Sequence, residues 1–158
     1  MAENEKNSED KVIQWVTFKL DDETYGIPVM QVMEVLRVTE VTPVPGAPDY
    51  VIGIINLRGN VVTVIDARKR FGLSTGSIED ASRIVIVEAG ENIVGMLVDC
   101  VTEVVYLKES EIDTAPNVGN EESSRFIQGV HSKKDYLLIL VDVNKMLTSE
   151  EWDEVTAI

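Results

Sequence analysis

Along most of the chain, apolar residues come in runs of four to eight that are bounded by Gly, Pro, Asp and Asn. Short runs of this kind, rich in Val and Ile, are typical of β-strands between turns. We expect strands near 13–20, 24–27, 35–41 and 61–65, and near 83–88, 93–97, 104–108 and 136–141. The segments 53–56 and 129–131 are candidates for one further strand in each half.

Turn and helix signals separate these runs. Asp21-Asp22-Glu23 and Gly90-Glu91-Asn92 fit hairpin turns between the first two strands of each half. Asp66 and Asp142 end an apolar run, where an N-cap would open one short helical turn. Thr148 or Ser149, followed by two glutamates, predicts a short closing helix.

The chain also repeats itself once. With a shift of 69 residues, Tyr25–Val35 aligns with Val94–Val104, and the glycine, two valines, the glutamate and the final valine coincide. With a shift of 76, Tyr50–Asp66 aligns with Phe126–Asp142, so the second half has a connector seven residues longer, which contains turn-forming residues at 115–120. General similarity among short-stranded β proteins is the alternative explanation, but it does not account for coincident glycines and acids.

This pattern predicts a mainly β protein made of two five-stranded barrels in tandem, related by a pseudo-two-fold axis, with few short helices. Closing a short sheet removes its exposed edges, and two small barrels can pack along a shared apolar seam. We expect a disordered acidic tail at 1–12, a domain at 13–150, and a C-terminal helix or tail at 150–158. The barrel halves are expected at roughly 13–76 and 77–150, with the chain crossing between them near the termini.

Composition narrows the function. The formal net charge is −14, from 28 acidic and 14 basic residues, which disfavours nucleic acid and anionic lipid as partners. Solubility alone would also explain the charge. The longest apolar run, 136–141, is far shorter than the roughly 20 residues that span a bilayer. A lone cysteine, Cys100, and no export signal favour a cytoplasmic protein without direct membrane insertion.

The sequence offers little catalytic chemistry. His131 is the one histidine, so neither histidine nor cysteine is available in the numbers that a zinc site needs. Phosphate-loop and dinucleotide motifs are absent, and Asp21-Asp22-Glu23 is too short for a calcium loop. We therefore expect no catalytic residue, no cofactor and no metal, and a binding module instead of an enzyme.

The two halves differ most at Asn56-Leu57-Arg58-Gly59, whose counterpart is Ser132-Lys133-Lys134-Asp135. Arg58 is suited to holding a carboxylate, and Glu34 is a candidate partner that would share one strand face with Val32. A surface ion pair without function is the alternative. Glu103 favours that alternative, because it repeats Glu34 with no arginine identified opposite it.

Several of these segments together resemble the CheW family. The similarity extends over roughly 13–151, and it rests most specifically on the Asn-Leu-Arg-Gly segment in its context. The motifs are Tyr25-Gly26-Ile27, Val32-x-Glu34-Val35, Pro45, Gly53-x-x-Asn56-Leu57-Arg58-Gly59, Val62 to Asp66 with Arg68 and Phe71, Val94-Gly95-x-x-Val98-Asp99-x-Val101-x-Glu103-Val104, and Tyr136 to Asp142.

The resemblance implies two SH3-like barrels around a joint hydrophobic core and no chemistry. It implies an adaptor between the cytoplasmic tips of transmembrane chemoreceptors and the histidine kinase CheA, recruited to membrane-associated receptor arrays. One barrel would dock on the kinase's regulatory domain, and the groove between the barrels would accept the receptor's helical hairpin. By motif, the receptor- or kinase-contacting residues would be Arg58, Glu34, Gly53, Val32 and Val104. How they divide between the two partners stays open.

Two other functions fit the same pattern. The chain could serve a kinase array that does not control flagella, because the same fold suits swimming chemotaxis and other kinase arrays. It could also be a regulatory β-barrel that binds a small molecule in the apolar seam between its halves.

Overall fold

The computed structural model describes residues 10–74, 76–114 and 125–157. Ten strands account for about half of this part of the chain. The first five are β1 (Val12–Leu20), β2 (Glu23–Pro28), β3 (Val32–Arg37), β4 (Val51–Leu57) and β5 (Asn60–Asp66). The other five are β6 (Arg83–Ala89), β7 (Asn92–Val98), β8 (Cys100–Lys108), β9 (Ile127–Ser132) and β10 (Leu137–Val141).

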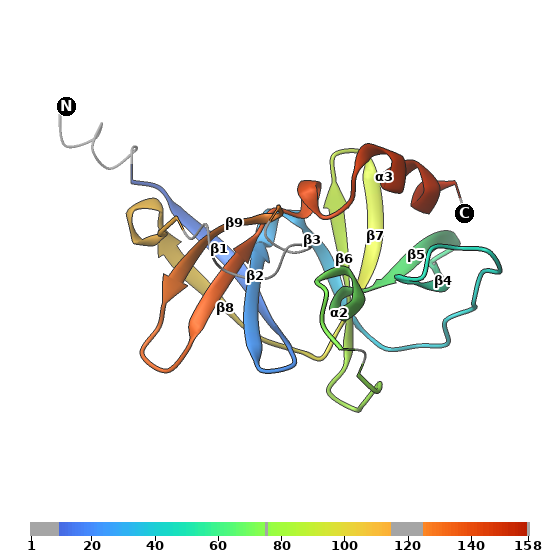
Figure 1. Ribbon diagram of the computed structural model, residues 1–158, viewed down its shortest axis with the longest axis horizontal. Helices are drawn as coiled ribbons and strands as arrows, with labels where there is room; N and C mark the ends of the chain where they lie inside the picture. The colour runs from blue at the N-terminus through green and yellow to red at the C-terminus, as the bar shows by residue number, and fades with distance from the viewer. Residues whose placement is uncertain (1–9, 75, 115–124, 158) are drawn as a thin grey trace.

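The strands form two five-stranded sheets that lie side by side as two lobes (Figure 1). Barrel A has the strand order β8-β1-β2-β10-β9, and barrel B has the order β3-β6-β7-β5-β4. An isolated bridge between Asp113 and Val130 adds pairing at the outer strand of barrel A, and one between Thr42 and Ile54 does so in barrel B. The expected mainly β fold of two SH3-like barrels is confirmed.

The strand register confirms the duplication. In barrel A, Val16 pairs with Val104, and in barrel B the residues 69 positions away, Val85 and Val35, pair in the same way. The parallel pairs also match, because Gly26 lies opposite Leu140 and Gly95 lies opposite Val64. The two barrels therefore share the same strand pairing at the level of individual backbone pairs.

The structure corrects the assignment of strands to barrels. A division into one barrel from 13–76 and one from 77–150 does not hold, because β1 and β2 pair with the late strands β8 and β10. Likewise, β3, β4 and β5 form a sheet with β6 and β7. The chain passes from barrel A to barrel B through the 3-10 turn η1 (Val29–Gln31) and returns at Asp99, between β7 and β8.

Three apolar clusters fill this arrangement. The largest lies along the seam and includes Phe18, Ile27, Phe71 and Phe126. Smaller clusters occupy the interiors of the barrels, one around Trp15 and the other around Ile84, Ile86 and Val64. Since neighbouring strand residues point to opposite faces, Trp15 fills barrel A while Val16 and Phe18 face the seam.

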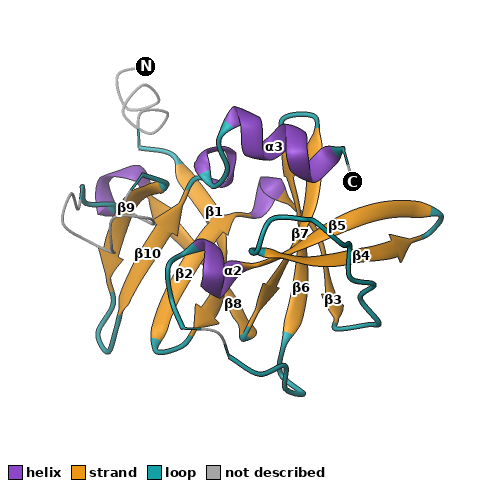
Figure 2. Ribbon diagram, turned by 45° about the vertical axis from the view of Figure 1, so that its right-hand side comes forward, coloured by secondary structure: helices purple, strands orange, loops and turns teal. Residues whose placement is uncertain are grey.

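Short helical elements follow the caps that the sequence indicates. Asp66 caps α2 (Ala67–Arg70), and Asp142 caps the 3-10 turn η3 (Val143–Lys145), each by accepting a hydrogen bond from a backbone N–H two residues on. A further 3-10 turn, η2 (Glu109–Glu111), follows β8. Helix α3 (Ser149–Thr156) begins with a capping box between Thr148 and Glu151, and it lies over barrel B in Figures 1 and 2.

Some of the expected segments lie outside the described residues, and others have different bounds in the structure. Residues 1–9 of the expected acidic tail and the turn-rich 115–120 lie outside the described residues. Residues 10–12 are not a free tail, because both carboxylate oxygens of Asp10 accept hydrogen bonds from Ser110, at 3.1 Å each, and β1 begins at Val12. Strand β3 begins at Val32, three residues earlier than the apolar run suggested, and ends at Arg37.

None of the helices in the described part of the chain has the length and apolar character needed to cross a bilayer. Among the same residues, no group of three or more His, Cys, Asp or Glu side chains is arranged to hold a metal ion.

Candidate functional site

Arg58 lies at the tip of the β4–β5 hairpin in barrel B. The two-residue turn requires left-handed backbone, with φ of +50° at Arg58 and +88° at Gly59. The Asn56 side chain stabilises it, because Oδ1 accepts a hydrogen bond of 2.8 Å from the Gly59 N–H. The Asn-Leu-Arg-Gly segment therefore forms a stabilised hairpin turn that presents one arginine at its tip.

The guanidinium of Arg58 binds the carboxylate of Glu34 on β3. Nη1 donates to Oε1 at 3.3 Å, and Nη2 donates to Oε2. The hydrogen bond from Arg58 lowers the pKa of Glu34, and in turn the pKa of Arg58 is raised. The Arg58 side chain remains 69% exposed, so this pair joins two strands and still presents a charged donor surface to a partner.

The second half carries a different contact at the equivalent place. Glu103 repeats Glu34, and its partner is the phenol of Tyr136, whose pKa is raised by burial and by this carboxylate. Lys134 occupies the position that corresponds to Arg58, and it is exposed. A carboxylate paired with arginine is therefore specific to barrel B among these two equivalent sites, as the difference between the halves had suggested.

Gly53 has a structural role that the sequence did not reveal. It is buried in β4 with φ of +158°, and a Cβ atom there would lie 2.2 Å from the Thr42 carbonyl oxygen. That same oxygen accepts the hydrogen bond of 2.8 Å from the Ile54 N–H, which joins Thr42 to β4. Gly53 thus allows the close approach of two backbones and offers no side chain to a partner.

The two valines of the predicted set lie on different barrels. Val32 begins β3 and packs partly against the seam core. The expectation that it shares a strand face with Glu34 is wrong, because a register shift between them pairs Val32 with Val87 and Glu34 with the adjacent Ile86. Val104 lies on β8 of barrel A and is 46% exposed. Arg58, Glu34, Gly53 and Val32 therefore all belong to barrel B, and Val104 stands apart from them.

Several exposed apolar residues escaped the sequence reasoning. Met30, in the crossing turn η1, is 96% exposed, and Met33 and Val35 on β3 point to solvent. On barrel A, Tyr106 accompanies Val104 on the outer positions of β8. The sequence does place apolar residues on both faces of β3 and of β8, which indicates that one apolar face of each strand is exposed. It does not indicate which face that is.

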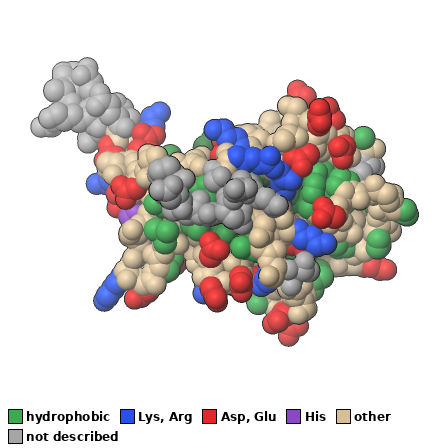
Figure 3. Space-filling view, in the orientation of Figure 1, with side chains coloured by type: hydrophobic (Ala, Val, Ile, Leu, Met, Phe, Trp, Pro, Cys, Tyr) green, Lys and Arg blue, Asp and Glu red, His purple; other side chains and the backbone are tan. Residues whose placement is uncertain are grey.

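A shallow hollow of about 290 Å³ lies beside the Arg58 hairpin on barrel B. Its lining residues include Thr42, Ile54 and the exposed Val61. Acidic side chains are spread over the face seen in Figure 3, and the largest group of lysine and arginine side chains lies near its middle. The combination of one exposed arginine, a hollow and scattered apolar side chains suits contact with a protein surface.

His131 and Cys100, the one histidine and the one cysteine of the chain, both lie on strands of barrel A. The carbonyl oxygen of Glu111 lies 2.8 Å from Nδ1 of His131, so this nitrogen carries the proton and donates. Cys100 is half-buried as the first residue of β8. Neither side chain has a hydrogen bond to a catalytic partner among the contacts of the described residues.

Comparisons with known proteins place this architecture. The CheW-like domain model matches residues 14–151. The chemotaxis protein CheW of Klebsiella aerogenes is 33% identical over 138 residues, which cover 87% of this chain and 83% of that relative. The Bacillus subtilis chemotaxis protein CheW is 36% identical over 135 residues, 85% of this chain and 86% of that protein. The crystal structure of the scaffolding protein TtCheW from Thermoanaerobacter tengcongensis superimposes with a TM-score of 0.81 at 33% identity, covering 89% of this chain and 96% of that one.

Proposed function

The chain belongs to the CheW-like domain family, and from this premise we propose that it couples the cytoplasmic tips of chemoreceptors to the regulatory domain of the histidine kinase CheA. The family consists of non-enzymatic scaffold proteins, and coupling receptors to CheA is its role. The observation that carries the proposal is the agreement of fold and sequence over nearly the whole chain, at a TM-score of 0.81.

On the kinase side, we propose that barrel B provides the contact. Its β4–β5 hairpin presents Arg58, 69% exposed and held by Glu34, next to the hollow that Val61 lines. Gly53 keeps this hairpin in place by allowing the Thr42–Ile54 bridge. A barrel surface with one charged anchor residue and apolar side chains around it gives a small interface, from which the partner can dissociate and rebind.

On the receptor side, we propose that the surface spanning both barrels accepts the helical hairpin. Met30 lies in the crossing turn η1, Met33 lies on the barrel B strand β3 that follows it, and Val104 is exposed on barrel A. Val32 packs against the seam core. A helix docks through apolar side chains spaced along one face, which requires apolar contacts at several points of a fixed surface.

The alternative of a small-molecule barrel gains no support from the seam. The space between the halves is filled by a continuous cluster of buried side chains, including Phe18, Phe71 and Phe126.

We further propose that residues 13–150 act as one domain, because both barrels contribute to this cluster. We also propose that the protein is recruited to receptor arrays through its partners.

The experiment that tests the function is reconstitution of CheA with chemoreceptor fragments on vesicles, with and without this chain. Kinase autophosphorylation should rise when the chain is present. Arg58→Ala should lower the activation while the far-UV circular dichroism and the urea midpoint stay near those of the unmodified protein, because Arg58 is exposed. The Lys134→Ala variant, at the equivalent exposed position of barrel A, is the matched control. Equal activation by both variants would refute a coupling role for Arg58.

A further inference from the structure

The two barrels are joined by two chain crossings that occupy equivalent positions in the internal repeat. One crossing passes through Met30, between β2 and β3, and the other passes through Asp99, between β7 and β8. The shift of 69 residues places Asp99 on Met30. We call these two crossings the Met30 joint and the Asp99 joint. A difference between the two residues is therefore a difference between two otherwise matching joints.

Asp99 connects the barrels through its side chain as well as its backbone. Its Oδ1 accepts a hydrogen bond of 2.8 Å from Nε of Arg68, and its Oδ2 accepts from Nη2 of the same guanidinium. Oδ2 also accepts a hydrogen bond of 2.8 Å from the N–H of Asp21. Arg68 belongs to α2 at the end of the barrel B strand β5, whereas Asp21 forms the β1–β2 turn of barrel A.

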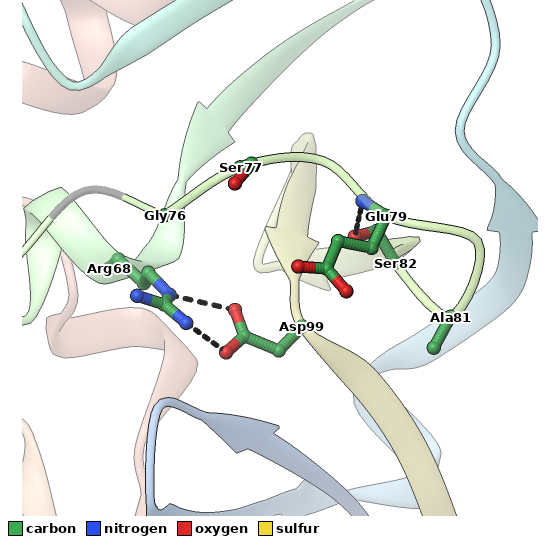
Figure 4. A pocket seen from close by; sticks show the side chains of 7 residues that line it. All are labelled: Arg68, Gly76, Ser77, Glu79, Ala81, Ser82 and Asp99. Atoms are coloured by element: carbon green, nitrogen blue, oxygen red, sulfur yellow. Dashed lines mark hydrogen bonds and ion pairs between the residues drawn. The ribbon is translucent and has the colours of Figure 1, made fainter.

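Figure 4 shows Arg68 and Asp99 facing each other with two contacts, in a pocket that Ser77, Glu79 and Ser82 also line. The two charged side chains are 19% and 29% exposed, so solvent screens the pair only in part. Burial raises the pKa of Asp99, but the hydrogen bonds from Arg68 and Asp21 outweigh it and leave the pKa below its ordinary value of 3.8. The carboxylate is therefore held in its charged form.

The equivalent joint has none of these groups. Met30 is 96% exposed, Asn144 occupies the place of Arg68, and Gly90 occupies the place of Asp21. Among the contacts of the described residues, the side chain of Asn144 bonds only to Asp142, within its own turn. The Asp99 joint is held by an ion pair, whereas the Met30 joint presents an apolar side chain to solvent.

We propose that the Arg68–Asp99 pair is a positioning contact that fixes the barrels relative to each other and so aligns the surface that spans them. Asp99 precedes β8 directly, and β8 carries Val104, the barrel A part of that surface. Loss of the pair detaches the β7–β8 crossing, together with the β1–β2 turn that is bound to Asp99, from α2, while the seam core still holds the barrels together. This inference rests on the proposed function for its consequence in binding, and on the geometry alone for its consequence in structure.

The structural part is tested by pulsed electron spin resonance distances between the barrels. Nitroxide labels are placed at Asp135→Cys in the β9–β10 turn and Glu91→Cys in the β6–β7 turn, both exposed, in a Cys100→Ser background. The Asp99→Ala variant should broaden or shift the distance distribution relative to the unmodified pair. Arg68→Gln is the second variant, because it removes the ion pair but leaves the Asp99–Asp21 bond.

The same short helix supplies a matched control. Arg70 in α2 forms a comparable ion pair with Glu151 in α3, at 2.7 Å, and α3 packs beside the barrel B strand β7. Glu151 also has a longer contact, of 3.9 Å, with Arg125 ahead of β9, so Glu151→Gln should reduce stability with a clearly smaller change in the distance between the labels than Asp99→Ala causes. A change of equal size in this control would refute the assignment of alignment to the Asp99 joint.

The binding part is tested with a chemoreceptor signalling fragment and with the isolated CheA regulatory domain. In Asp99→Ala, affinity for the receptor fragment should fall about tenfold, equal to about 1.4 kcal/mol, while affinity for the kinase domain stays within about twofold. Unchanged distances, unchanged receptor affinity, or equal losses for both partners would each overturn the proposal. If the unmodified chain binds neither partner, the proposed function fails, and the distance measurement still decides whether the pair aligns the barrels.

Discussion

Replacing Gly53 by alanine should open barrel B where Thr42 bridges to β4. The new Cβ would lie 2.2 Å from the carbonyl oxygen of Thr42 and 2.6 Å from its carbonyl carbon. Both atoms belong to backbone, so no side-chain rotation relieves the clash. The strand must move away from Thr42, and the two hydrogen bonds between Thr42 and Ile54, of 2.8 and 2.9 Å, are lost.

The size of the effect follows from these contacts. Each backbone hydrogen bond contributes about 1 kcal/mol net, and more if a buried partner is left unsatisfied. A non-glycine residue held at the φ of +158° adds about 1–3 kcal/mol of strain. We expect the free energy of unfolding to fall by about 3–5 kcal/mol, a large part of the about 5–15 kcal/mol typical of a domain.

Urea unfolding followed by tryptophan fluorescence measures this change, because Trp15 and Trp152 are both buried. Gly59→Ala is the control. It also has positive φ, +88°, but its Cβ would meet no atom within 4 Å, so its cost should be only about 1–2 kcal/mol. Amide exchange at Ile54 should accelerate in Gly53→Ala alone. Equal destabilisation by the two substitutions, with Ile54 still protected, would refute the proposed role of Gly53 in this bridge.

Three further predictions concern α3 and acid stability. Glu151→Gln should lower the free energy of unfolding by about 1–3 kcal/mol, because it weakens a partly buried ion pair with Arg70, and thermal unfolding measures the loss. Thr148→Ala should cost about 1 kcal/mol by removing the helix cap, which circular dichroism of the C-terminal helix and urea unfolding together would detect. The pKa values of Asp99 and Glu151 are lowered in the folded protein, so their contribution is present above their ordinary values of 3.8 and 4.5 and is lost as the pH falls through the lowered values. Stability should therefore decrease on acidification in this range, and less steeply in Asp99→Asn; an unchanged slope in that variant would contradict the assignment.

The sequence alone determined the local elements and the duplication. Alternation and turn residues located the strands, and Asp66, Asp142 and Thr148 marked the caps, because these signals depend on neighbours only a few residues away. The repeat also singled out Arg58 and Glu34, which the fold brings together. The contact roles of Arg58, Glu34, Gly53, Val32 and Val104 remain predictions.

Only the tertiary structure decided which strands pair. Alternation tells which residues share a face, but it carries no information on whether a partner comes from the same half or the other. The pairing of Gly26 with Leu140, across 114 residues, was therefore beyond the reach of any local pattern. The same holds for the Arg68–Asp99 contact and for the exposure of Met30, because both arise where the chain crosses between barrels, and the position of a crossing is fixed by the packing of the whole seam.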